Sequence, residues 1–225
     1  MCGRYTFTQT PDASLLIFPD GIEVNTGPRF NIAPSQYNPV IPMADARKIH
    51  YFKWGLIPSW AKDPKIGFRM INARSETVFE KPAFREGIWK RRCLVLADGF
   101  YEWKKTGQGK VPHWISLSDQ RPFYFGGLSE VWRDPHGWDV ESFSILTTRP
   151  NEVMANIHDR MPVILEQDRA KAWLRNSLTQ QDIQALCEPI PSDMLDVRPV
   201  STDVGNVRND YPELIKRQDG LLGLF

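Results

Sequence analysis

The stretch CLVLADGFYEW, residues 93–103, decides the fold class of this 225-residue chain. It is an apolar run followed by aromatic residues, a composition typical of a β-strand. Three similar stretches follow it, VPHWISL (111–117), PFYFGGLSEVW (122–132) and ESFSILTT (141–148). They are separated by KTGQG, SDQR and RDPHG, which are rich in turn-forming residues. The middle of the chain is therefore predicted to form consecutive β-strands.

Strands are also predicted on both sides of this region. GRYTFT (3–8) alternates polar and aromatic residues, which is the period of a half-buried strand. YNPVIPM (37–43) and KIHYFKW (48–54) are expected to pair with each other. RMPVILE (160–166) and LDVRPVS (195–201) are predicted to be later strands.

Helices are predicted towards the two ends of the chain. Thr10-Pro11-Asp12 is a good helix start, because Pro suits the first helical position and an acid suits the first turn. That helix is expected to end by Gly21. Helical spacing recurs in PNEVMANI (150–157), DRAKAWLRN (168–176) and TQQDIQALC (179–187).

Many strands with short turns and a few helices predict an α+β fold. We expect one domain over residues 1–225, with a curved, mostly antiparallel, β-barrel-like core and peripheral helices. The pattern is not an alternation of strand and helix, and the chain contains no GxGxxG or GxxxxGK[ST] phosphate loop. A doubly wound nucleotide-binding fold is therefore not expected.

Composition narrows the class of protein. The chain is 41% apolar and 24% charged with a formal net charge of +1, which excludes a disordered, collagen-like or coiled-coil protein. This balance gives no overall attraction to nucleic acid, so a DNA site would need a local basic patch. Cys2, Cys93 and Cys187 are far apart, without metal-ligand spacing, so we expect no metal and a reducing cytoplasm. No secretory leader or membrane span is predicted.

The opening MCGRYTF places Cys2 directly after the initiator methionine. If Met1 is removed, Cys2 carries an α-amine and a thiol on adjacent carbons. That 1,2-aminothiol is chemically reactive, whereas an interior cysteine usually behaves as a small apolar residue.

Three further stretches contain candidate polar groups. RMINARSET places Asn72, Arg74 and Glu76 at alternate positions, which would share one face of a strand; a loop in which Asn72 caps a helix is the alternative. Glu102 lies between two aromatic residues, where burial would raise its pKa and suit proton transfer. An exposed glutamate on the polar face of a strand is the simpler interpretation. His158 precedes an acid, so it is either a proton carrier or half of a structural pair.

Other residues receive simpler interpretations. Trp60, in a loop bounded by proline, could stack on a base, whereas Trp54 is expected in the core. The cluster KRR at 90–92 is interpreted as a solvated helix face rather than a binding site.

Seven motifs together resemble the SOS-response-associated peptidase family, whose members process abasic sites by crosslinking to damaged DNA. In chain order they are MCGRYTF (1–7), RFNIAPS (29–35), WGLIPSW (54–60), INARSET (71–77), ADGFYEW (97–103), IHDRMP (157–162) and VGNVRND (204–210). The resemblance spans nearly the whole chain. It implies a single domain with a β-barrel-like core and a positively charged groove that holds Cys2 after Met1 is removed.

The resemblance also implies roles for individual residues. The catalytic set is Cys2, Asn72, Glu102 and His158. The DNA-binding set is Arg4, Arg74 and Arg160 at phosphates, Trp60 near splayed bases, and Asn31 at a motif position without a clear role. VFEKPAF (78–84) lacks an arginine that some members use for another phosphate, and Lys81 or Arg85 is the candidate substitute.

The implied function is that of an abasic-site sensor, which binds single-stranded DNA and forms a covalent thiazolidine through Cys2 after removing its own Met1. No cofactor is implied, and a monomer is expected. Strand cleavage at the abasic site and a link to the replication machinery stay open. Two rivals remain: an N-terminal-nucleophile amidohydrolase or peptidase, and a non-enzymatic binding domain with a structural cysteine.

Overall fold

Two curved β-sheets share the stretch that runs from residue 92 to residue 106. The computed structural model describes residues 2–8, 27–107 and 109–218. The strands are β1 (Arg4–Phe7), β2 (Arg29–Ile32), β3 (Tyr37–Pro42), β4 (His50–Trp54), β5 (Asn72–Arg74), β6 (Arg92–Ala97), β7 (Gly99–Thr106), β8 (Gly109–Leu117), β9 (Phe123–Arg133), β10 (Asp139–Thr148), β11 (Met161–Pro162), β12 (Ile164–Leu165) and β13 (Leu195–Pro199).

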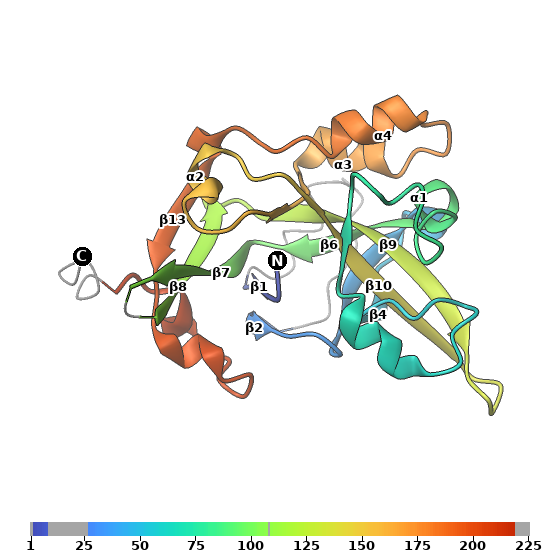
Figure 1. The fold of residues 1–225 in the computed structure, drawn as a ribbon, viewed down its shortest axis with the longest axis horizontal. Coiled ribbons are helices and arrows are strands. Elements are labelled where there is room, and N and C mark those ends of the chain that lie inside the picture. Colours follow the sequence, from blue (N-terminus) through green and yellow to red (C-terminus); the bar gives the residue numbers. More distant parts are fainter. Residues whose placement is uncertain (1, 9–26, 108, 219–225) are drawn as a thin grey trace.

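Short helices connect and cover the strands. They are α1 (Gly87–Lys90), α2 (Glu152–Ala155), α3 (Gln167–Trp173), α4 (Gln180–Leu186) and the 3-10 helices η2 (Met43–Asp45), η3 (Pro64–Arg69), η4 (Ser192–Met194), η5 (Thr202–Gly205) and η6 (Pro212–Ile215). α3 and α4 lie together over one end of the sheets (Figure 1). Within the described part of the chain, no helix is long and apolar enough to cross a membrane.

The larger sheet closes on itself. Its strands follow the order β10-β4-β3-β6-β9, and β9 pairs again with β10, so these strands form a barrel. The pairs are antiparallel except β10 with β4, and β5 also joins β10 in parallel. The expected α+β class with a curved, mostly antiparallel, barrel-like core and peripheral helices is confirmed.

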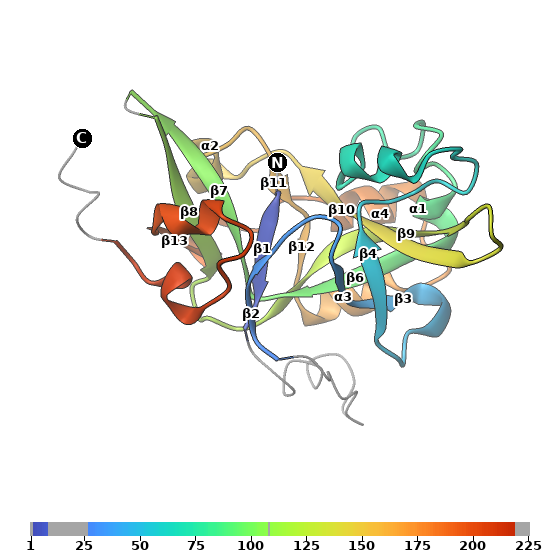
Figure 2. The same ribbon diagram turned by 90° about the horizontal axis from the view of Figure 1, so that it is seen from below.

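The smaller sheet places the beginning of the chain at the centre of the molecule. Its strand order is β13-β8-β7-β1-β2, and every pair is antiparallel. Figure 2 shows β1 between the β7–β8 hairpin and the barrel. Tyr5 of β1 is fully buried and meets Trp54 and Phe125 of the barrel edge-on, with ring centroids 5.2 and 5.6 Å apart. This aromatic contact joins the two sheets.

The stretch 93–103 forms two strands that belong to different sheets. Asp98 lies between them, and its carboxylate accepts hydrogen bonds from the Thr6 hydroxyl at 2.6 Å and from the backbone N–H of Thr8 at 2.5 Å. The indole of Trp114 also donates to the Thr6 hydroxyl, at 3.2 Å. The corner between the sheets therefore also anchors the end of β1.

Most other predicted strands are confirmed. The strands at 3–8, 37–43, 48–54 and 195–201 are present, and β3 pairs with β4 as expected. RMPVILE forms two short strands rather than one, because the backbone of Val163, between them, hydrogen-bonds to two different neighbouring strands. Its N–H donates to Leu146 and its carbonyl accepts from Gly126.

The helical predictions have mixed outcomes. Helices occur within the stretches at 150–157 and 179–187 and over most of 168–176, but each is shorter than its motif. The helix predicted from Thr10 to Gly21 lies outside the described residues.

The interpretation of residues 90–92 as a solvated face is wrong for Arg92. This side chain is 1% exposed, and its guanidinium donates to the carbonyls of Ile88 at 2.6 Å and Trp173 at 2.8 Å. It also lies over the Trp173 ring. Carbonyl groups at the ends of α1 and α3 satisfy the buried cation.

Candidate functional site

Three adjacent strands bring two of the polar motifs together. β5 lies beside β10, with Asn72 opposite Ile145 and Arg74 opposite Thr147. β11 pairs with the same end of β10, and the IHDR motif immediately precedes β11. Residues that are more than eighty positions apart in the sequence therefore meet at one end of β10. Asn72 is on a strand, so its alternative interpretation as a helix cap is wrong.

Asn72 contacts Cys2 directly. Its side-chain Nδ2 donates to the Cys2 carbonyl oxygen at 2.9 Å. Its Oδ1 atom is also buried, but it accepts no hydrogen bond from a residue in the described ranges. The Asn72 amide is therefore anchored to Cys2 through its nitrogen, and its oxygen is an available hydrogen-bond acceptor beside Cys2.

The Cys2 thiol is held in its protonated form. The residue is fully buried, and its Sγ lies 3.7 Å from the Arg4 carbonyl oxygen. Burial raises the thiol pKa well above its ordinary value, and the negative charge of Glu102 raises it further. Met1 itself lies outside the described residues.

Glu102 is buried on β7, with 3% of its surface exposed, so its interpretation as an exposed glutamate is wrong. Side chains alternate along a strand, so Glu102 shares a face with Phe100, which lies in the main core. β7 pairs with β1, with Arg4 opposite Tyr101, so Glu102 lies beside the start of the chain, and its negative charge acts on the Cys2 thiol. Cys2, Asn72 and Glu102 thus form one centre.

His158 lies just after α2. Its Nδ1 accepts a hydrogen bond from the Arg160 backbone N–H at 3.0 Å and lies 2.8 Å from the Asp159 carboxylate. Accepting from the Arg160 N–H requires an unprotonated Nδ1, whereas an ion pair with Asp159 requires a proton on Nδ1, so the two contacts belong to different protonation states of the ring. Both earlier interpretations therefore remain compatible with the geometry, as a structural hydrogen bond does not prevent proton transfer at Nε2.

The Arg160 side chain is 12% exposed and forms a bidentate ion pair with Glu76, with N–O distances of 2.6 and 2.8 Å. Its Nη2 also donates to the Thr147 carbonyl at 2.7 Å. Partial burial by itself would raise the pKa of Glu76, but the hydrogen bonds and charge of Arg160 outweigh it and hold that pKa below its ordinary value. The Nε of Arg160 is buried and donates to no residue of the described chain, which leaves one donor available.

Arg4 and Asn31 hold the VGNVRND segment. The Arg4 guanidinium donates to Asn31 Oδ1 at 2.8 Å, to the Val204 carbonyl at 2.7 Å and to the Gly205 carbonyl at 3.2 Å. Asn31 Nδ2 lies within 3.2 Å of the carbonyls of Val204, Asn206 and Asn209. A DNA phosphate at Arg4 would have to share or displace one of these acceptors, so this predicted contact stays a prediction.

A pocket opens beside Asn72. It has a volume of about 340 Å³ and a mainly apolar wall. Three of the predicted residues, Trp60, Asn72 and Arg74, line it. Trp60 is 59% exposed, and the exposed Arg74 side chain makes no hydrogen bond or ion pair with the residues that the structure describes.

Other residues of this pocket include some that the motifs did not single out. Lys81 contributes to its wall, whereas Arg85 does not, so Lys81 is the better placed of the two candidate substitutes. Met70, Thr77, Pro82 and Phe84 complete the wall with Ala83. Only the spacing of VFEKPAF after INARSET could have indicated these residues, because apolar side chains carry no chemical signal of their own.

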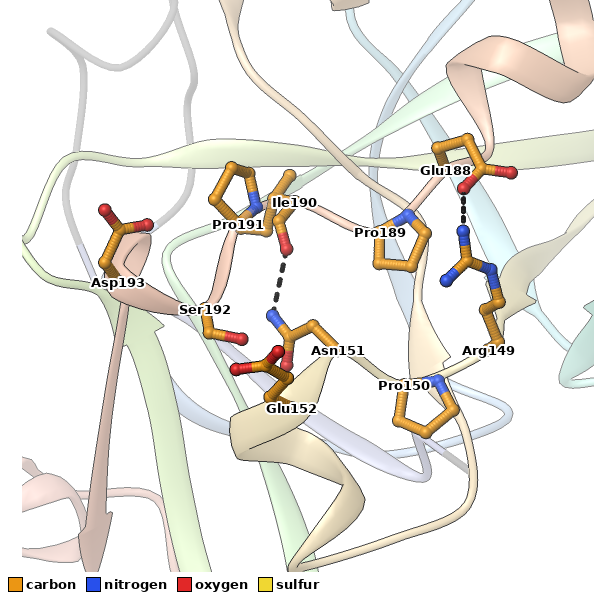
Figure 3. A pocket seen from close by; sticks show the side chains of 10 residues that line it. All are labelled: Arg149, Pro150, Asn151, Glu152, Glu188, Pro189, Ile190, Pro191, Ser192 and Asp193. Carbon is orange, nitrogen blue, oxygen red and sulfur yellow. Dashed lines mark hydrogen bonds and ion pairs between the residues drawn. The ribbon is translucent and has the colours of Figure 1, made fainter.

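A second cavity, of about 550 Å³, is separate from this centre (Figure 3). It lies between the start of α2 and the segment 188–193. Arg149 and Glu188 pair with each other across it, and Asn151 donates to the Ile190 carbonyl at 2.9 Å. Arg149, Glu188 and Asn151 are therefore engaged within the protein, and none of them was predicted to be functional. Within the described ranges, no cluster of His, Cys, Asp and Glu could hold a metal ion.

The fold and this centre define a class: an α+β barrel protein in which the second residue, a cysteine, is buried against an asparagine and a glutamate beside an open pocket. The family model described as SOS response associated peptidase (SRAP) matches residues 1–207, and the chain belongs to this family. The resemblance seen in the motifs is therefore confirmed.

Individual relatives agree over nearly the whole chain. The abasic site processing protein YoqW of Bacillus subtilis is 42% identical, over 96% of this chain and 99% of that protein. The abasic site processing protein HMCES of Xenopus tropicalis is 32% identical, over 95% of this chain and 77% of that protein. A crystal structure of a Bacteroides thetaiotaomicron protein matches with a TM-score of 0.86 and 28% identity, over 96% of this chain and all of that one.

Proposed function

We propose that this protein processes abasic sites in DNA by forming a thiazolidine crosslink through Cys2. The observation that carries the proposal is the Asn72 side chain, which is anchored to Cys2 by its nitrogen and keeps a buried acceptor available beside it. The adjoining pocket supplies the exposed Trp60 and the exposed Arg74, whose side chain has no ion pair within the described residues. Relatives that match almost end to end are named as abasic site processing proteins, which supports the same function.

We propose that the protein hydrolyses its own Met1–Cys2 peptide bond and so frees the α-amine of Cys2. The chemistry then uses both this amine and the Cys2 thiol. The Cys2 α-amine attacks the ring-opened aldehyde of the abasic site, and loss of one water gives an imine. An α-amine has a pKa of about 7.7–8.0 and is partly neutral at pH 7. The thiol then adds to the imine carbon, while its proton passes to the imine nitrogen, and closes a five-membered ring.

The surrounding residues have separate roles in this proposal. Glu102 moves protons, because its buried carboxylate lies on β7, the strand that pairs with β1 next to Cys2. His158 assists at the sugar hydroxyl or imine through Nε2. The available Asn72 oxygen accepts the N–H of the new ring and orients it.

The DNA would be held mainly through its backbone. Arg74 donates to a phosphate, which gives a grip that does not depend on sequence, whereas Arg160, whose Nε is buried, would reach a phosphate only if its ion pair with Glu76 opened. Trp60 stacks on an unpaired base, and this stacking favours single-stranded DNA as the substrate. Strand cleavage at the abasic site would require a further elimination step and is a secondary possibility for the same centre.

Intact mass spectrometry with single-stranded DNA that contains an abasic site tests this proposal. We expect a heat-stable adduct equal in mass to DNA plus protein without Met1, less one water. Cys2→Ala keeps the amine and should form an adduct only when borohydride traps the imine. A wild-type protein that forms no stable adduct would disprove the proposal.

The same experiment separates the rivals. An amidohydrolase would turn over small amides and leave abasic DNA unmodified. A binding domain with a structural cysteine would keep its full DNA affinity, and form no adduct, in both the wild type and Cys2→Ser.

A further inference from the structure

A second groove continues from the pocket beside Asn72. It has a volume of about 420 Å³, and Trp60 lines both cavities. The cations of its wall are Lys62, Lys65 and Arg69, which flank or belong to η3. Neither the motifs nor the family resemblance assigned a role to these residues. A strand that passes Trp60 from the Cys2 centre would enter this basic groove.

The cations of the basic groove are exposed, and none forms an ion pair with an acid in the described ranges. The one acid in the wall, Asp63, caps η3, where its carboxylate accepts from the Lys65 backbone N–H at 2.9 Å. The chain as a whole carries a formal net charge of only +1. The basic groove is therefore a local positive patch of the kind that a nearly neutral protein needs to attract DNA.

The basic groove is built on a well-anchored segment. The buried indole of Trp132 donates to the Ala61 carbonyl at 2.7 Å, which fixes the loop that carries Trp60. Behind the groove, the Leu56 N–H donates to the Met70 carbonyl at 3.1 Å. The cations thus project from an anchored backbone, which reduces the ordering that binding of a ligand would require.

We propose that the basic groove binds the phosphates of the single strand that continues beyond the abasic site. This inference rests on the proposed function and assigns the path of the DNA. Trp60 stacks on the base at the boundary, and Lys62, Lys65 and Arg69 hold the backbone that follows. A single strand is expected, because bases inside a duplex are stacked on their neighbours and offer no free face to the indole.

The test uses a single-stranded oligonucleotide with a tetrahydrofuran abasic analogue, which has no aldehyde and cannot crosslink. One probe extends about ten nucleotides on each side of the analogue, within the site sizes of single-strand binding proteins. A second probe extends about two. In the triple variant Lys62→Ala/Lys65→Ala/Arg69→Ala, we expect the affinity for the long probe to fall on the order of tenfold, and that for the short probe to change little.

The salt dependence makes the test quantitative. Each lost phosphate contact to a single strand should reduce the magnitude of the slope of log K against log salt by about 0.7. The slope of the triple variant should therefore be smaller in magnitude by about 2. The charge-conserving variant Lys62→Arg/Lys65→Arg/Arg69→Lys should keep the slope. The matched control is Lys110→Ala/Lys171→Ala/Arg175→Ala, which removes three exposed cations, one on β8, one on α3 and one just after α3. This control should also keep the wild-type slope.

Three results would overturn this inference: an unchanged slope in the triple variant, an equal loss in the control, or a loss seen only after a complementary strand is annealed. The proposed function is tested separately, by the heat-stable adduct of the wild type with true abasic DNA. At saturating DNA, the triple variant should form that adduct at the wild-type rate, because the basic groove does not touch Cys2.

Discussion

At the scale of single residues, the burial of Cys2 determines the order in which its two groups react. Burial and the neighbouring Glu102 raise the thiol pKa, so the thiol is almost entirely protonated at neutral pH. A free α-amine ordinarily has a pKa of about 7.7–8.0, closer to neutral pH than that of the buried thiol, so it is the more available nucleophile. The amine should therefore attack first, and the thiol should act only once the imine is held beside it, where intramolecular placement offsets its low reactivity.

The raised pKa predicts how Cys2 reacts with iodoacetamide at different pH values. The reactive thiolate forms only above the thiol pKa, so the alkylation rate should still increase with pH beyond about 9. In denaturant, where the burial is lost, the rate should level off near the ordinary value of about 8.5. Peptide mass spectrometry measures both profiles. A plateau near 8.5 in the native protein would contradict the burial effect.

Asn72 allows a second prediction at this scale. Asn72→Ala removes both the hydrogen bond to Cys2 and the available acceptor, so the single-turnover rate of crosslinking should fall by about tenfold or more. Asn38→Ala is the control, because Asn38 Nδ2 also donates to a backbone carbonyl, that of Gln36, but outside the site. The two variants should lose similar stability, about 1 kcal/mol, and only Asn72→Ala should lose rate. Equal rates would mean that Asn72 has only a structural role.

At the scale of elements, strands were predictable where local chemistry determines them. Alternation predicted β1, and apolar runs with turns predicted β8, β9 and β10. Periodicity could not show that 93–103 turns from one sheet into the other, because the cause is a distant contact between Asp98 and Thr6. For the same reason Arg92 was misinterpreted, since its carbonyl partners belong to α1 and to the end of α3.

The candidate site shows the same division. Cys2, Asn72 and Glu102 were found because unusual residues stand in specific motifs. The ion pair between Arg160 and Glu76 was not predicted, although both residues belong to quoted motifs. Only the pairing of β5 and β11 with β10 brings the two residues together, and this pairing is not visible in the sequence. The basic groove was also missed, since its cations are separated by ordinary residues.

The segment between β4 and β5 also gives a prediction at this scale. Gly55 has a φ of +117°, and a Cβ added at Gly67 would lie 2.7 Å from the Gly55 carbonyl oxygen. Gly67→Ala should therefore push η3 away from the barrel and lower the free energy of unfolding by about 1–3 kcal/mol. Gly205→Ala is the control, because an added Cβ there meets no atom within 4 Å. Equal stability of the two variants in urea would contradict the close approach.

At the scale of the whole molecule, the contact between Arg4, Asn31 and the 204–209 backbone brings the two ends of the described chain together. It spans 200 positions between Arg4 and Val204, and it holds the late segment against β1, the strand that carries Cys2 into the site. Distant parts of the chain therefore jointly determine where the reactive residue lies. This arrangement explains why a motif as late as VGNVRND belongs to the same pattern as MCGRYTF.

The last prediction separates this structural role from DNA binding. Asn31→Ala removes three donor contacts to backbone carbonyls and an acceptor for Arg4, so hydrogen exchange of residues 204–209 should accelerate on the order of tenfold, equivalent to about 1.4 kcal/mol. The slope of DNA affinity against salt should stay at the wild-type value, because an amide neutralises no phosphate. Asn156→Ala, which removes one exposed side-chain bond to Glu152 on α2, is the control and should leave exchange at 204–209 unchanged. If Asn31→Ala left that exchange unchanged but weakened DNA binding, Asn31 would be a DNA contact, in line with its place in the DNA-binding set that the resemblance implied.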